Sequence, residues 1–96
     1  MARLRFTPLA EADLNSILDY IAESAPLTAR NFVSTIREKC DLIATQPEMG
    51  RRRPEFQGNY RSLAVGQYVV FYRVHPEEVQ IHRILHGSRD MLALLE

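Results

Sequence analysis

The chain lacks the marks of several protein classes. It has one cysteine, Cys40, so no intrachain disulfide can form, and its place in a helical pattern favours a role in an apolar core. No run of about 18 apolar residues occurs that would span a bilayer, and residues 1–6 lack the apolar run of a signal peptide. We therefore expect a soluble protein of the reducing cytoplasm, without membrane contact.

A net charge is missing as well. The chain has 12 basic and 12 acidic side chains, a balance that argues against a protein that coats nucleic acid. The charges are unevenly spread, since five arginines and a single acid, Glu55, lie between Arg51 and Arg73. No metal site is expected. His82 and His86 could be ligands, but the sequence has no second cysteine and no carboxylate at ligand spacing to complete a site. No cofactor is expected either.

Length and periodicity predict one domain that begins with a strand and two helices. Ninety-six residues, 46% of them apolar, suit a single core spanning residues 1–96. Alternation predicts a strand at residues 3–6, and the Thr-Pro pair at 7–8 supplies an N-cap and a first helical residue. Pro26 separates this helix from a second one, which the Gln-Pro pair at 46–47 stops. The two helices should form a hairpin.

The second half of the chain is rich in Val, Ile, Tyr and Phe and predicts three strands, at residues 59–65, 68–74 and 78–85. Gly66-Gln67 suits a type II′ turn, so these strands should form an antiparallel meander, with strand 3–6 at one edge. Residues 88–95 predict a short helix that folds back on the sheet. The expected fold class is α+β: a helical hairpin packed on a small twisted antiparallel sheet, in the order β-α-α-β-β-β, with a short C-terminal helix.

Arginines recur inside the apolar strands. An unpaired buried guanidinium costs several kcal/mol, so each must meet a partner or water, and we interpret this half of the chain as a binding surface. The predicted target-binding residues are Arg61, Arg73, Arg83, His86 and Arg89.

A second basic cluster, Arg51, Arg52 and Arg53, is flanked by prolines. It would contact phosphate or an acidic protein surface. The alternative is a solvated loop tethered by Glu48 and Glu55.

Short motifs in a fixed order carry a family resemblance: Asp13-Leu14 with Tyr20-Ile21 and Ala25-Pro26; Met49-Gly50-Arg51 with Arg53-Pro54-Glu55; Arg61-Ser62; Val65-Gly66 with the run from Tyr68 to Arg73; and the run from Ile84 to Asp90. Over nearly its whole length the chain resembles the ParE-type toxins of the RelE/ParE superfamily. The resemblance implies the toxin of a type II toxin–antitoxin module. It also implies a partner, a ParD-like antitoxin whose disordered acidic and apolar tail folds along the toxin, in a hetero-oligomer.

The resemblance leaves two activities open. ParE-type toxins are associated with poisoning DNA gyrase by binding, whereas RelE-type toxins cut messenger RNA on the ribosome. This chain has Val69 where RelE-type enzymes carry arginine, Leu63 where a lysine is expected, and no tyrosine in the tail at 91–96. These departures favour gyrase binding, with no catalytic residue in this chain.

The alternative is a ribosome-dependent endoribonuclease, in which His86 would act as acid or base while Arg61, Arg83 and Arg89 stabilise the phosphorane. The other interpretation of His86 is structural: it would hydrogen-bond to shape the exit of its strand. A third possibility is a degenerate module that only binds its antitoxin.

The first helix also predicts an antitoxin site. Its apolar residues cover more of the helix circumference than one sheet face requires, so some apolar area should stay exposed and accept an antitoxin helix. The predicted contacts are Leu9, Leu14, Leu18 and Ile21. The alternative is that all four belong to the core.

Overall fold

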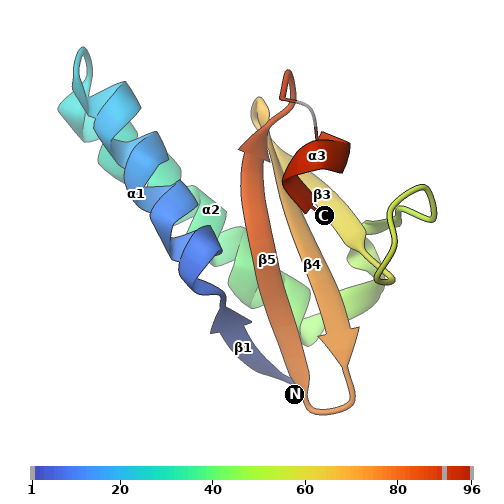
Figure 1. Cartoon of the computed structure of the whole chain (residues 1–96). Helices are drawn as coiled ribbons and strands as arrows, with labels where there is room; N and C mark the ends of the chain where they lie inside the picture. The colour runs from blue at the N-terminus through green and yellow to red at the C-terminus, as the bar shows by residue number, and fades with distance from the viewer. Residues whose placement is uncertain (1, 90, 96) are drawn as a thin grey trace.

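The computed structural model describes residues 2–89 and 91–95, so Asp90 of the tail motif lies outside the description. It shows a helical hairpin on one face of a five-stranded sheet, and a short helix on the other face (Figure 1). The elements are β1 (Arg3–Phe6), α1 (Pro8–Ala22), α2 (Pro26–Thr45), the 3-10 turn η1 (Pro47–Met49), β2 (Arg51–Arg52), β3 (Arg61–Val65), β4 (Tyr68–His75), β5 (Glu78–His86) and α3 (Met91–Leu95). The expected α+β class is confirmed.

Local signals behave as the sequence predicts. The hydroxyl of Thr7 accepts a hydrogen bond from the backbone N–H of Ala10 at 3.0 Å, which caps α1, and Pro8 is the first helical residue. Pro26 opens α2. Gly66 has a φ of 59° between β3 and β4, as the first central residue of a type II′ turn requires.

The sheet differs from the expected antiparallel meander in two ways. Its order is β1-β5-β4-β3-β2, and β1 runs parallel to β5, with Arg3 opposite Glu78. No hairpin joins these two strands, so no turn dictates their direction. The second difference is β2, which pairs with the start of β3. A strand of two residues is too short to show alternation in a sequence.

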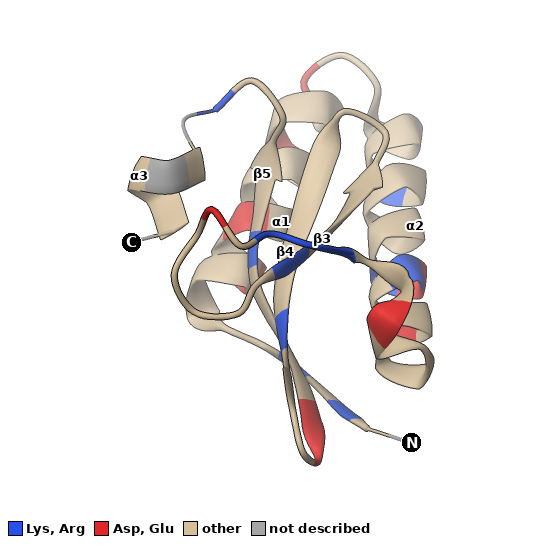
Figure 2. Ribbon diagram, turned by 90° about the vertical axis from the view of Figure 1, so that its right-hand side faces the viewer, with Lys and Arg blue, Asp and Glu red and all other residues tan. Residues whose placement is uncertain are grey.

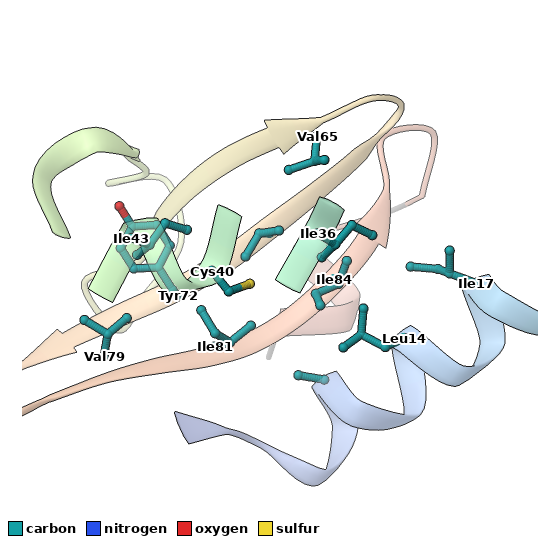
Figure 3. Packing of buried hydrophobic residues seen from close by; sticks show 12 residues of the cluster. Leu14, Ile17, Ile36, Cys40, Ile43, Val65, Tyr72, Val79, Ile81 and Ile84 are labelled. Atoms are coloured by element: carbon teal, nitrogen blue, oxygen red, sulfur yellow. The ribbon is translucent and has the colours of Figure 1, made fainter. Parts of the chain in front are cut away.

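The main core lies between the hairpin and the sheet (Figure 3). It consists of Ala10, Leu14, Ile17, Ile36, Cys40, Ile43, Val65, Val70, Tyr72, Val79, Ile81 and Ile84. Cys40 is fully buried, and burial raises the pKa of its thiol to about 12, which confirms its place in the core. Leu14 is also buried, so its predicted contact with an antitoxin is wrong: this side chain fills the interface between α1 and the sheet.

A smaller core covers the opposite face of the sheet. Phe71 and Leu85 of the sheet pack there with Leu95 of α3 and with Phe56 and Tyr60 from the segment between β2 and β3. The tail therefore folds back on the sheet, as expected. No helix in the described part of the chain is long and apolar enough to cross a membrane.

Candidate functional site

A bulge in β5 organises one end of the molecule. Phe71 lies opposite Arg83, but the next residue of β4 lies opposite Ile81, so His82 is the additional residue on β5. Past this point β1 no longer pairs with β5, and α1 supplies the hydrogen bonds instead. The carboxylate of Asp13 accepts a hydrogen bond from the backbone N–H of Ile84 at 2.9 Å.

The same carboxylate binds Arg83. Two guanidinium nitrogens of Arg83 donate to Asp13 at 2.8 and 2.9 Å, and a third donates to the carbonyl of Leu94 at 3.2 Å. Both charged side chains are largely buried, with 13% and 14% exposed, and the hydrogen bond to Asp13 raises the pKa of Arg83. Arg83 therefore joins α1, β5 and α3. Its guanidinium is used within the chain, and its role in target binding stays a prediction.

Arg61 and Arg73 also have partners, although neutral ones. Arg61 donates to the carbonyl of Gly50 at 2.7 Å. Arg73 donates to the hydroxyl of Tyr60 at 2.9 Å, and its guanidinium carbon lies 4.6 Å from the centre of the Tyr60 ring. Neither arginine is neutralised by a carboxylate in the described residues. Both hold a loop in place and keep their charge.

His86 lies in a local hydrogen-bond network at the end of β5. Its Nδ1 accepts the backbone N–H of Ser88 at 3.1 Å, so the ring proton lies on Nε2, which faces Oε1 of Gln67 at 3.2 Å. The Ser88 hydroxyl lies 2.8 Å from the same Nδ1. This arrangement matches the structural interpretation of His86, in which the ring shapes the strand exit.

A groove of about 740 Å³ lies between α1 and the β5–α3 connection, and we call it the α1–β5 groove. Three of the four residues of the nuclease alternative, Arg83, His86 and Arg89, line it. Arg61 does not. It lies opposite Tyr72, whereas His86 lies opposite Tyr68, four residues away along β4, which is about 13 Å of strand. A general base and phosphate-stabilising cations must lie within hydrogen-bond reach of one phosphate, so this set does not converge.

The second surface is a hollow of about 590 Å³ lined by Arg52, Arg53, Arg61 and residues of the β2–β3 connection, and we call it the arginine hollow. Figure 2 shows the blue segments of β2 and of the start of β3 side by side. Arg53 is fixed: it donates to Glu55 at 2.8 Å, which lowers the pKa of that carboxyl group, and to the Ser62 hydroxyl at 3.0 Å.

The sequence offered Glu48 and Glu55 as side chains that tether this loop, and the tether is confirmed for Glu55. Glu55 binds Arg53, but Glu48 acts through its backbone carbonyl, which accepts from Arg61 at 3.3 Å. Arg51 and Arg52 are exposed and have no carboxylate partner in the described residues.

The predicted antitoxin face of α1 is partly available. Leu9 is 53% exposed, and Leu18 and Ile21 are half-buried. Tyr20 is 71% exposed and borders the α1–β5 groove, although the sequence analysis did not assign it a site. The sequence signal that could have identified it is an aromatic residue beside Asp19, on the charged face of a helix.

Comparisons with known proteins agree with this fold. The family described as ParE toxin of type II toxin-antitoxin system, parDE, matches residues 4–91. Toxin ParE1 of Caulobacter vibrioides is 37% identical, over 99% of both chains, and toxin RelE2 of the same organism is 37% identical over 93% of this chain and 99% of its own. A solved structure described as the chromosomal ParDE TA system from P. aeruginosa has a TM-score of 0.78 at 31% identity, covering 90% of this chain and 96% of that one. The chain therefore belongs to the ParE toxin family of type II toxin–antitoxin systems.

Proposed function

We propose that this toxin arrests growth by binding DNA gyrase in the cytoplasm, and that a ParD-like antitoxin neutralises it by forming a hetero-oligomer with it. The observation that carries the proposal is the dispersal of the nuclease residues. Arg83 is bound to Asp13, and His86 is hydrogen-bonded at the exit of its own strand. Arg61 lies opposite Tyr72, four residues along β4 from the residue opposite His86. The lack of convergence among these residues supports inhibition by binding over catalysis.

We assign to gyrase a set of arginines that have no carboxylate partner in the described residues. Arg89 is exposed in the α1–β5 groove, and Arg51 and Arg52 are exposed on β2. Arg61 and Arg73 add charge on the neighbouring strands β3 and β4, on opposite faces of the sheet, while each holds a loop in place. At protein interfaces, cationic side chains of this kind contribute more to the orientation of the two partners and to the association rate than to the affinity.

The decisive experiment is supercoiling of relaxed plasmid by purified gyrase, with and without the toxin. Inhibition that added antitoxin relieves is expected, together with trapped cleaved DNA. Arg89→Gln should weaken inhibition, whereas Arg30→Gln, an exposed arginine of α2 away from both surfaces, should not. If a large excess of toxin leaves supercoiling unchanged, gyrase is not the target.

A specific observation supports the second candidate, a ribosome-dependent endoribonuclease: Arg83, His86 and Arg89 share one groove, and one of the similar toxins is named RelE2. His86→Gln separates the two candidates. General acid–base catalysis contributes roughly 100- to 10,000-fold, so a nuclease would lose its activity, while a binding poison would keep it. A degenerate module would cause no growth arrest when expressed without antitoxin.

For the antitoxin we propose a docking site on α1 formed by Leu9, Leu18 and Ile21. The resemblance to a ParDE complex supports such a partner, and the exposure of Leu9 supplies apolar area for it. Leu9→Glu should weaken antitoxin binding measured by calorimetry. Leu42→Glu, at an exposed leucine of α2, is the matched control and should leave binding unchanged.

A further inference from the structure

The arginine hollow carries more positive charge than the chain neutralises. The side chain of Arg52 has no hydrogen-bond or ion-pair partner in the described part of the chain. Arg61 donates through one nitrogen, and only to backbone carbonyls, which leaves its charge intact. Arg53 is balanced by Glu55. Two uncompensated guanidinium groups therefore line one concave surface.

The loop that closes the hollow adds neutral donors. Gly58 and Asn59 both have positive φ, at 115° and 57°, so the chain turns sharply there. The backbone N–H groups of Gln57 and Gly58 donate no hydrogen bond to any residue that the structure describes, and the carboxamides of Gln57 and Asn59 are equally without partners there. All three residues line the hollow. Adjacent unused N–H groups beside cations are typical of anion sites.

The origin of the donors favours one class of anion. They come from three segments that all line the hollow: β2, β3 and the connecting loop. A carboxylate presents two oxygens in one plane and can be bound by a single guanidinium, as in the 2.8 Å contact of Glu55 with Arg53, which lines the hollow. A phosphate presents its oxygens tetrahedrally and can accept from several directions.

We infer that the arginine hollow is an oxyanion site that holds a phosphate of a nucleic-acid backbone, with Arg52 and Arg61 as its charged ligands. The inference rests on the proposed function for the origin of that phosphate, because gyrase acts on DNA. One such site agrees with the balanced net charge of the chain, which does not suit a protein that coats nucleic acid.

The test is a titration of the ¹⁵N-labelled toxin followed by amide chemical shifts. Inorganic phosphate should shift the amides of Gln57 and Gly58 saturably, and acetate at the same ionic strength should bind at least about tenfold more weakly. A short DNA duplex at low salt should shift the same amides. Arg52→Gln should lower phosphate affinity about tenfold, since one charge-assisted ligand is lost. Arg30→Gln on α2 should leave it unchanged.

Absence of a saturable shift, or an unchanged affinity in Arg52→Gln, would overturn the inference. Equal binding of acetate would identify a carboxylate site for a protein partner instead, and phosphate binding without duplex binding would refute the nucleic-acid source. The supercoiling assay keeps the two proposals apart. If Arg52→Gln binds phosphate and duplex as the wild type does, while the wild-type toxin inhibits gyrase, only this inference fails. If wild-type toxin binds phosphate and duplex but does not inhibit gyrase, only the gyrase proposal fails.

Discussion

Removing one hydroxyl group, in Tyr72→Phe, should destabilise the toxin strongly. The ring of Tyr72 is fully buried in the main core, and its hydroxyl donates to the carbonyl of Pro47 at 2.7 Å and accepts the backbone N–H of Gly50 at 2.8 Å. These two bonds fix the turn that leads from α2 to β2. Phenylalanine keeps the packing of the ring, so the substitution isolates the hydroxyl.

The magnitude follows from the groups left behind. A buried polar group that loses its only partner costs about 1–3 kcal/mol, and here a buried N–H and a half-buried carbonyl lose theirs together. We expect the free energy of unfolding to fall by about 2–4 kcal/mol. Urea denaturation should show this as a lower midpoint with an unchanged m-value.

The matched control is Tyr68→Phe on the same strand. Tyr68 packs against the rings of Phe32 and His86, but its hydroxyl has no hydrogen bond within the described residues. Its loss should change the free energy of unfolding by less than about 0.5 kcal/mol. Equal effects of the two substitutions would refute the role assigned to the Tyr72 hydroxyl.

Three further predictions concern the stability of the fold. Asp13→Asn breaks a buried ion pair, so the free energy of unfolding measured by urea denaturation should fall by about 3–5 kcal/mol. Glu11→Gln breaks an exposed pair and should lower it by at most about 1 kcal/mol. Similar losses in the two variants would contradict the argument from burial. Folding lowers the pKa of His82 from 6.5, first through burial and then through nearby arginine charge, so the unfolded chain takes up the proton first. Stability should therefore decline as pH falls below about 6.5. His82→Gln should flatten that decline, unlike His75→Gln at the exposed turn. Gly50→Ala should lower the melting temperature, because the added Cβ would lie 2.7 Å from Cε1 of the Tyr72 ring and overlap it. An unchanged melting temperature would show that the turn can shift to make room for the Cβ.

The elements of this fold could be predicted from local patterns. Thr7, Pro8 and Pro26 mark helix ends by their own chemistry, and Gly66 marks a turn by its freedom at positive φ. The 3.6-residue period of apolar side chains separates the buried face of each helix from its charged face. The sequence by itself therefore determined the α+β class, the helical hairpin and the family resemblance, because each depends on residues close together in the chain.

The site depended on contacts that no local pattern contains. Asp13 and Arg83 are 70 residues apart, and the packing of α1 against β5 brings them together. An arginine inside an apolar strand indicates that its side chain needs a partner, but the sequence does not show which residue that partner is. The sequence therefore could not distinguish Arg83, which is used inside the protein, from Arg52, which is free. Only the tertiary structure decided between them, because pairing and burial depend on which distant segments the sheet places side by side.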